Sequence, residues 1–524
     1  MAILTDCVLL DTLLVFSLLF VTLFLWLKWK HSYWQRRGVR TLPAHWFFGH
    51  LKDAMLLRKS AGVVIGELHR QAADEDNVIG IYILYKPFLL VRNPELIKQI
   101  MIKDFHLFPN RHFDGKSNSD TLGNWSLFSV KNPEWRQLRT KMSPVFTSGK
   151  LKSLFLLMQE SGEMMREYLQ GQFADSNIVS ISVKDLFSKY TTIVIASMAF
   201  GIRANCFDTP PPEFFVNYRK KQSHIVMHNP FCFLTYTAQK AFLRNLSVNF
   251  RFFFLFFLPE IGKYLGLKTL GDYTDYFRKV FWDSMDNRSI TKTKRGDLID
   301  SLLQLKNENA DDTDFRFEGD ILLAQAALFF GAGRETSITT MTYDLCELAK
   351  YPEIQRRARE EILEEIQTAN GVTYEAVNKM KYLHQVINET LRLYPSAPVL
   401  DRISIEDYML PNTNITIEKG TPIYVALYGI QRDPRFYKDP ERFDPERFSD
   451  ERKNEIVPCT FLPFGEGPRN CIGMRLGILQ TAIGLIAILR DYEVSLNPSW
   501  MSVTDTRRVF TSSPAGFLLD LKKI

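Results

Sequence analysis

Cys471 has the sequence context of a reactive thiol. It lies in the run from Phe464 to Gly473 (FGEGPRNCIG), which an amphipathic helical pattern follows at once. Gly465, Gly467 and Pro468 favour a tight turn before it. The start of a helix presents unpaired N–H groups and the positive end of the helix dipole, both of which favour an anion. Such conditions lower the pKa of a thiol, so Cys471 is predicted to be a metal ligand or a nucleophile.

The residues around Cys471 favour a ligand. Gly473 lets the helix approach a flat group, and Arg469 offers a planar guanidinium to a carboxylate. A nucleophilic cysteine would need a histidine base, and no His lies near it in the sequence. A buried, inert cysteine is the other alternative, although it would not require this glycine pattern. The chain has 6 Cys and no CxxC pair, which argues against a disulfide framework and a zinc ribbon.

A second chemical pattern lies inside a long apolar helical run. Glu335 and Thr336 follow Gly333, which weakens a helix by up to about 1 kcal/mol. A threonine hydroxyl can also bond to a backbone carbonyl and open the helix locally, so the site is predicted to admit a ligand or water. A polar, exposed helix face is the alternative. The glycine pairs Gly331–Gly333 and Gly465–Gly467 lack the third glycine of a nucleotide-binding loop, so no nucleotide fold is indicated.

Two further pairs of residues have helical spacing. Glu389 and Arg392 stand three apart, and Trp135 and Arg139 stand four apart, so each pair shares one helix face. A surface salt bridge is the ordinary interpretation of the first pair taken alone. The second pair is predicted to point at a common target.

Taken together, these strings resemble the cytochrome P-450 family over essentially the whole chain. The Phe464–Gly473 run resembles the loop whose cysteine thiolate binds heme iron and favours O–O cleavage. The segment from Ser143 to Lys150 is similar to the branch that holds insect detoxification and vertebrate drug-metabolising enzymes. The family's proline-rich stretch after the N-terminal segment is reduced here to Pro43.

The resemblance implies a role for each motif. It implies heme b with Cys471 as the axial iron ligand, Thr336 and Glu335 as the groups that deliver protons during oxygen activation, and a buried charge triad. The triad comprises Glu389, Arg392 and, from the Asp439–Phe448 motif, Arg447. The other implied cofactor-binding residues are Trp135, Arg139, Arg402, Arg469, Phe464 and Gly473, with Arg111 as a further propionate candidate.

The resemblance also places a substrate pocket. It implies contributions from the Phe113–Phe128 loop, Leu328, Phe329, Phe330, Ala332, Ala397–Leu400 and the Val509–Pro514 turn. These residues are apolar or small, which favours a lipophilic substrate. The run Phe252–Leu258 is too short to span a bilayer. It is either a buried core helix or, as the resemblance implies, part of the pocket roof and of a loop that dips into a membrane.

Helical patterns dominate the elements that must position these residues. A mainly α fold with a small β component is predicted, as one large P-450-type heme domain behind an N-terminal transmembrane helix. The expected helices are Glu134–Lys141, Lys150–Gln172, Asp320–Lys350, Glu353–Thr368, Met380–Leu393 and Met474–Arg490. The expected strands are Val78–Leu90, Ile403–Met409, Ile415–Ile417 and Phe517–Leu521.

The N-terminus is predicted to be an uncleaved membrane anchor. Thr12–Leu27 is apolar and uncharged, close to the roughly 20 residues that span a bilayer. Basic residues and tryptophans follow it, which leaves the rest of the chain in the cytosol by the positive-inside rule. A secretory signal is the alternative, but no basic residue precedes the segment and no cleavage site follows. The predicted domains are an anchor at 1–34 and a catalytic domain at 35–524, on the endoplasmic reticulum membrane.

The composition limits the partners. A net charge of +6 is small for this length and spread along the chain, so no nucleic-acid partner is indicated. A pI near 8.8 suits acidic partners or anionic membrane lipid. Since the chain has no flavin or nicotinamide fingerprint, the resemblance implies a separate NADPH-dependent flavoprotein reductase, with a cytochrome b5-like donor as an additional partner. Arg136, Lys141 and Arg475 are the candidate residues to bind an acidic surface of the flavoprotein reductase.

The predicted reaction is the insertion of one oxygen atom from O2 into a lipophilic small molecule, a xenobiotic or a hormone-like lipid. Two rivals stay open. One is a heme enzyme that rearranges peroxides, which would need no proton relay at Glu335 and Thr336. The other is a non-enzymatic heme carrier or sensor.

Overall fold

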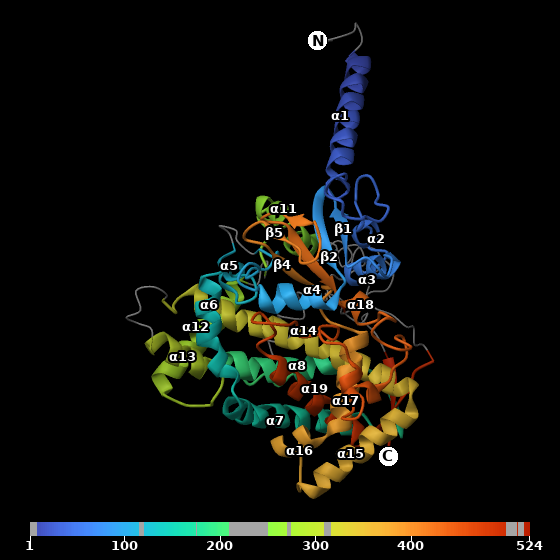
Figure 1. Ribbon diagram of the computed structural model, residues 1–524. Helices are drawn as coiled ribbons and strands as arrows, with labels where there is room; N and C mark the ends of the chain where they lie inside the picture. The colour runs from blue at the N-terminus through green and yellow to red at the C-terminus, as the bar shows by residue number, and fades with distance from the viewer. Residues whose placement is uncertain are drawn as a thin grey trace.

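The computed structural model describes residues 8–114, 120–173, 176–208, 250–269, 274–308, 316–498, 511 and 518–524. Helices dominate these residues and small sheets complete them, which confirms the predicted fold class (Figure 1). The α-helices are α1 Val8–Lys30, α2 Lys52–Met55, α3 Ala61–Gln71, α4 Pro94–Lys98, α5 Thr121–Trp125, α6 Glu134–Met142, α7 Ser148–Gln172, α8 Val183–Phe200, α11 Pro259–Tyr264, α12 Thr274–Thr291, α13 Leu298–Glu308, α14 Asp320–Lys350, α15 Pro352–Thr368, α16 Tyr374–Lys379, α17 Lys381–Leu393, α18 Leu427–Ile430 and α19 Met474–Leu489.

Shorter elements link these helices. One π-helical turn covers Gln99–Lys103, and 3-10 turns cover Gln35–Arg37, Ser143–Phe146, Pro445–Phe448 and Lys453–Glu455. The strands are β1 Val78–Ile83, β2 Lys86–Val91, β3 Ile178–Ser182, β4 Val399–Ile403, β5 Tyr408–Met409, β6 Thr416–Ile417, β7 Pro422–Ala426, β8 Tyr492–Leu496 and β9 Leu518–Lys523.

The six predicted helices all form, each within two residues of the expected bounds. The long helix α14 runs from Asp320 to Lys350 as predicted. Helix α8 was missed. It is buried on nearly every side, so its apolar residues do not form the one-sided stripe from which an amphipathic helix is predicted.

The strand predictions are less accurate. The run Val78–Leu90 is not one strand but the antiparallel hairpin β1–β2, which turns at Leu84 with φ of 51°. The prediction Ile403–Met409 is mostly wrong, because β4 ends at Ile403 and a bend separates it from β5. Strand β9 begins at Leu518, and the predicted start at Phe517 lies outside the described residues.

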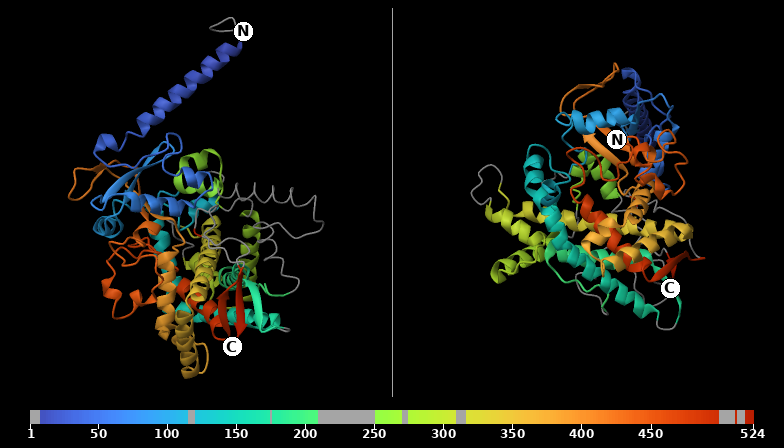
Figure 2. Two further views of the ribbon diagram at one scale, coloured as in Figure 1. Left: turned by 90° about the vertical axis from the view of Figure 1, so that its right-hand side faces the viewer. Right: turned by 60° about the horizontal axis from the view of Figure 1, so that its bottom comes forward.

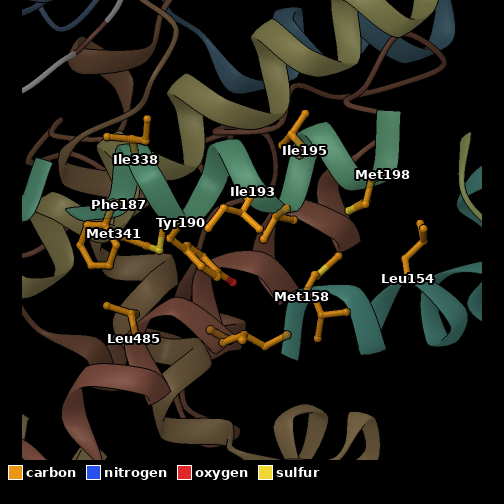
Figure 3. Close-up of a cluster of buried hydrophobic side chains, with 14 of the residues drawn as sticks. Leu154, Met158, Phe187, Tyr190, Ile193, Ile195, Met198, Ile338, Met341 and Leu485 are labelled. Atoms are coloured by element: carbon orange, nitrogen blue, oxygen red, sulfur yellow. The ribbon is translucent and has the colours of Figure 1, made fainter. Parts of the chain in front are cut away.

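The main sheet has the strand order β1-β2-β7-β4 and lies beneath α1, apart from the helical body (Figures 1 and 2). Helix α14 crosses the centre of that body, with α8 and α19 beside it. Tyr190 of α8, Met341 of α14 and Leu485 of α19 meet in the core between them (Figure 3). Gly484 permits this close contact, since a Cβ there would collide with the Met341 sulfur. The three helices therefore form a rigid frame.

Helix α1 projects from the sheet end of the molecule as an exposed apolar rod (Figures 1 and 2). By length and composition the stretch Val8–Arg37 could cross a membrane, a test that signal sequences also pass. Only Asp11 and Leu27 of α1 are buried.

The segment after α1 is attached to the sheet. Trp34 is 0% exposed and lies on Gly80, where any side chain would collide with its indole. The Trp34 backbone N–H donates to the Tyr82 hydroxyl at 3.0 Å, and the His31 ring lies 2.7 Å from the Leu84 carbonyl oxygen. These contacts fix α1 to the β1–β2 hairpin.

Asp344 of α14 is a buried acid in an unfavourable setting. It is 0% exposed, and neither carboxyl oxygen has a hydrogen-bond partner in the described part of the chain. Burial raises the pKa of Asp344 well above its ordinary value, and the neighbouring Thr390 hydroxyl on α17 opposes this without reaching hydrogen-bonding geometry. Asp344 therefore stays protonated in the folded chain at pH values where the unfolded chain ionises it, and this difference lowers stability as pH rises.

We expect Asp344→Leu to raise the melting temperature, and to raise it more at pH 8 than at pH 5. An unsatisfied buried polar group costs about 1–3 kcal/mol, which sets the scale of the gain. Thermal unfolding at both pH values measures it, with the exposed Asp286→Leu on α12 as the control. An equal gain at both pH values would contradict the proposed protonation.

Candidate active site

The loop before α19 places Cys471 on the wall of an internal cavity. Gly465 and Gly467 both have φ of 73°, a region that favours glycine. A side chain at Gly467 would also collide with the Met101 carbonyl oxygen. The Cys471 N–H donates to the Phe464 carbonyl at 2.8 Å and closes the turn. The cavity measures about 660 Å³, and both Phe464 and Cys471 line it.

The electrostatics of Cys471 correct one expectation. Cys471 lines the cavity and its side chain is exposed to that space, while the protein around it still desolvates the thiol and so raises its pKa. The Gly473 N–H, Arg139 and Arg111 oppose this effect without reversing it. The predicted net lowering by the helix start is therefore wrong for the protein alone, because desolvation is the larger effect. A bound cation would restore the thiolate. No His is among the described residues that line the cavity, so a nucleophile would lack a histidine base.

Two glycines make the Cys471 wall flat. Gly473 is the N-cap of α19, and Gly477 lies one helical turn further on. Both line the cavity, and a Cβ added at Gly477 would meet no atom within 4 Å, while one at Gly473 would come no closer than 3.9 Å, to Phe146. A planar group has room to lie against this face. Gly477 was not predicted, although its i, i+4 spacing from Gly473 is a signal that would have found it.

Four arginines crowd one side of the cavity: Arg111, Arg139, Arg402 and Arg469. Arg402 is 1% exposed, donates from Nη1 to the Asp401 carbonyl at 2.8 Å, and has no hydrogen-bond partner for Nε in the described chain. Burial and Arg111 lower the pKa of Arg402 to about 9. Burial, then Arg111 and Arg402, lower the pKa of Arg469 to about 8. Burial is the larger cause of both shifts, and repulsion among the arginines adds to it, so bound anions would relieve both.

The cavity carboxylate among these arginines is Asp401. Arg111 donates to it at 3.1 Å, and the backbone N–H groups of His112 and Phe113 donate at 2.6 and 3.1 Å. Asp401 was not predicted, and nothing in the sequence pattern marks it. With its oxygens committed to these donors, it leaves charge on the other arginines uncompensated.

Trp135 and Arg139 do share one face of α6, but they do not contact the same group. The Arg469 guanidinium lies 4.3 Å from the centre of the Trp135 ring. Arg139 donates to the backbone and side-chain oxygens of Asn470 at 2.9 and 2.8 Å. Trp135 thus supports Arg469, while Arg139 holds the loop beside Cys471.

Helix α14 forms the wall that carries Glu335 and Thr336, and both side chains line the same cavity as Cys471. The Thr336 hydroxyl donates to the Ala332 carbonyl at 2.6 Å, as predicted for a threonine at this site. The helix is nevertheless continuous from Asp320 to Lys350, so the expected local opening is not seen. Sequence reasoning also missed the neighbouring Arg334, which is 2% exposed.

The three predicted triad residues contact one another where α17 meets the Pro445–Phe448 turn. Arg392 donates from Nε and Nη2 to the Glu389 carboxylate at 2.7 and 2.8 Å, and Arg447 Nε lies 3.4 Å from it. Burial raises the pKa of Glu389, and Arg392 opposes the shift. Arg392 also donates to the Gln431 carbonyl at 2.8 Å, so the group joins α17 to the segment that precedes the Cys471 loop.

The remaining walls are mainly apolar. They include Phe113, Leu122, Leu127, Phe128, Leu328, Phe329, Phe330, Ala332, Ala397, Val399 and Leu400 of the predicted pocket, and Phe252 and Phe256 of the run that the resemblance placed at the pocket roof. Phe146 and Ile195 also line it and were not predicted. Of the Val509–Pro514 turn only Thr511 is described, and it lines the cavity; residues 115–119 of the Phe113–Phe128 loop also lie outside the described chain.

The Phe252–Leu258 run is part of the core. Phe257 and Leu258 are 0% exposed, and the run packs against Phe113 and Tyr424. The Tyr424 hydroxyl donates to the Phe256 carbonyl at 3.1 Å. This favours the buried alternative over a loop that dips into a membrane.

The residues of this cavity fit a flat, apolar group that carries carboxylates and a metal, with Cys471 as the metal ligand. The face formed by Gly473 and Gly477 leaves room for the planar group, and the arginines supply positive charge for its carboxylates. The Cys471 thiol would ionise on binding the metal cation. This is the donor set of a heme-thiolate protein.

Comparison with known proteins agrees with this class. The cytochrome P450 family model matches residues 39–519. The chain is 38% identical to cytochrome P450 6k1 of Blattella germanica over 94% of this chain and 93% of that protein. It is 35% identical to the probable cytochrome P450 6g2 of Drosophila melanogaster, over 97% and 98%. It is 32% identical to cytochrome P450 9e2 of Blattella germanica, over 97% of each.

The chain belongs to the cytochrome P450 family, whose members bind heme through a cysteine thiolate on the iron. It is therefore a heme-thiolate monooxygenase that acts on small molecules, and its relatives place it with insect members of the family.

Proposed function

We propose that this protein is a membrane-anchored monooxygenase of lipophilic compounds, with Cys471 as the iron ligand. The observation that carries the proposal is that one apolar cavity has the Cys471 thiol on one wall and the Glu335–Thr336 pair on another. Heme bound there would supply the binding and reductive splitting of O2. Arg402, whose Nε has no hydrogen-bond partner in the described chain, would bind the heme carboxylates, and Arg469 and Arg139 would add positive charge beside them. Trp135 would support Arg469, and Phe464 and Gly473 would face the heme plane.

The chain's own groups then have separate tasks. Thr336 and Glu335 would hold and pass protons toward the reacting oxygen, since both reach the cavity from α14. The apolar walls would exclude water and orient a lipophilic substrate. The acid–alcohol pair favours a monooxygenase over an enzyme that rearranges peroxides or a heme carrier. NADPH consumption with purified reductase and a lipophilic substrate distinguishes the three.

We further propose that electrons come from NADPH through a separate flavoprotein reductase, with a cytochrome b5-like protein as an additional donor. Arg136 and Arg475 are exposed, near the Cys471 loop in sequence or on adjoining helices, and would attract an acidic partner surface. Turnover that falls steeply with added salt would support this, and loss of activity on omitting the reductase tests the need for it.

We expect Thr336→Ala to uncouple the reaction. Heme binding and substrate affinity should stay near wild type, while product formed per NADPH falls and hydrogen peroxide rises. A lost general acid costs about 10²–10⁴ in rate, and the low end or less is expected because the Thr336 hydroxyl also serves the Ala332 carbonyl.

The matched control is Thr342→Ala. Thr342 lies on α14 and makes the same bond, to the Ile338 carbonyl at 2.7 Å, but it does not line the cavity. Product and peroxide are assayed in parallel. An unchanged ratio in Thr336→Ala would assign the proton route to other groups.

The anchor, residues 1–34, is proposed to hold the catalytic domain, residues 35–524, on the cytosolic face of the endoplasmic reticulum. We expect removal of Met1–Leu27 to release the protein from membranes almost completely, because the Phe252–Leu258 run is buried. Membrane fractionation of full-length and shortened chains measures this. Substantial residual binding would point to a second membrane contact.

A further inference from the structure

Arg334 places a buried positive charge beside the cavity. Its side chain is 3% exposed, whereas that of its neighbour Glu335 is 43% exposed. Arg334 Nε donates to the Thr192 hydroxyl at 2.9 Å, and its two terminal nitrogens donate to the Ser188 hydroxyl and the Glu335 carboxylate. Burying a guanidinium is costly unless it is paired and hydrogen-bonded. These contacts with α8 and Glu335 meet that need.

The contact constrains Glu335. Adjacent side chains on a helix point about 100° apart at 3.6 residues per turn, so this contact turns the Glu335 carboxylate and the Arg334 guanidinium toward each other. Its carboxylate still lines the cavity, one residue before Thr336. Glu335 is thus held between a buried cation and the site where protons are needed.

We propose that Arg334 is a positioning residue that keeps Glu335 ionised and turned toward the guanidinium, and so sets the pH range over which Glu335 passes protons. The proposal rests on the role assigned to Glu335 above. Arg334 is not among the described residues that line the cavity, so its effect on the reaction would pass through Glu335. An opposite charge in contact favours the carboxylate form.

Several other polar and titratable groups around this site have contacts of their own or are neutral. Asp297, which also lines the cavity, accepts from Arg288 at 2.8 Å. Lys189 of α8 lies over the Tyr168 ring at 4.4 Å. Burial raises the pKa of the Cys206 thiol to about 12, so it is neutral. From α19, Gln480 contributes only a neutral amide, 3.4 Å from the Gly333 carbonyl.

An infrared titration of the heme-loaded full-length protein tests the charge directly. The protonated-carboxyl band of Glu335 is the one that disappears in Glu335→Gln. In Arg334→Gln and Arg334→Met this band should appear at a pH about 1 unit higher than in wild type, the low end of the usual range because Glu335 is partly exposed. Arg334→Lys, which keeps the charge, should stay near wild type. Equal shifts in all three variants, or none, would overturn the proposal.

Turnover measurements distinguish the proposed role of Arg334 from the proposed proton role of Glu335. The pH midpoint of product formed per NADPH should move upward in Arg334→Gln by the same amount as the infrared band. This titration should be absent whenever Glu335→Gln is present, with or without Arg334→Gln. If Glu335→Gln alone leaves product per NADPH unchanged at every pH, the proton role of Glu335 fails. If Glu335→Gln acts but Arg334→Gln shifts neither midpoint, only the role of Arg334 fails.

A stability measurement covers the case in which neutral Arg334 variants do not fold. In Glu335→Gln the arginine remains and loses this carboxylate, so the melting temperature should drop at neutral pH. The drop should shrink as pH falls and the wild-type carboxylate takes up its proton. The exposed Glu364→Gln on α15 is the control. A drop that does not change with pH would overturn the proposal.

Discussion

Cys471→Ser is expected to abolish the red-shifted Soret band of the reduced carbonyl complex, and with it all monooxygenase turnover. A serine hydroxyl is too weak an acid to replace a thiolate on the iron, and the push toward O–O cleavage would go with it. The effect should be complete, because no other cysteine of the described chain lines the cavity. Spectra of the purified ferrous protein under carbon monoxide measure it.

Cys459→Ser is the matched control. Cys459 lies twelve positions earlier in the same irregular stretch, outside the cavity, and burial raises the pKa of its thiol to about 11. This variant should keep the wild-type spectrum. An unchanged spectrum in Cys471→Ser would instead remove Cys471 from the iron and leave the cavity without its assigned ligand.

Arg392→Ala is expected to be a folding lesion. Glu389 is 0% exposed, and Arg392 supplies two of its hydrogen bonds, at 2.7 and 2.8 Å. Removing one partner of a buried pair typically costs about 3–5 kcal/mol, because the other charge stays buried without it. Arg447, at 3.4 Å, is too distant to replace both bonds. Little heme-loaded protein should accumulate, as measured by heme content per milligram of purified chain.

The exposed pair on α15 provides a control for arginine loss as such. Arg356 contacts Glu353 at 3.0 Å and Glu360 at 2.6 Å, with side chains more than half exposed. Arg356→Ala should leave yield and melting temperature unchanged. If Arg392→Ala gave normal yields of folded, heme-loaded but inactive protein, the pair would serve catalysis and not stability.

The sequence predicted well those parts of the site that depend on local spacing. The glycine turn before Cys471 and the i, i+3 face that joins Glu389 to Arg392 are short-range patterns, and the structure has both. The predicted lowering of the Cys471 pKa by the helix start was too large. Burial, which depends on the whole fold, has the larger effect on that pKa. The site residues that were not predicted depend on contacts between segments that are far apart in the sequence.

Asp401 and the orphaned Nε of Arg402 illustrate this limit. The contacts around these two residues depend on the pairing of β4 with β7 and on Arg111, which binds Asp401 from a segment almost three hundred positions earlier in the chain. Helix α8 shows a related limit, because a helix buried on all sides has no polar face to reveal its period. Arg334 was visible in the sequence, but its burial follows from the hydroxyls that α8 presents.

The contact of Trp34 with Gly80 decides where a trimmed chain can start. Cutting before Lys28 leaves the indole seated on the hairpin, with its N–H bond to Tyr82 and the His31 contact to Leu84 intact. Cutting after Trp34 would remove the indole that covers Gly80 and would expose the Gly80 backbone together with one face of Tyr82. A soluble version made for crystallisation should therefore begin between Lys28 and His31, and one that begins at Gln35 should aggregate through the bared hairpin.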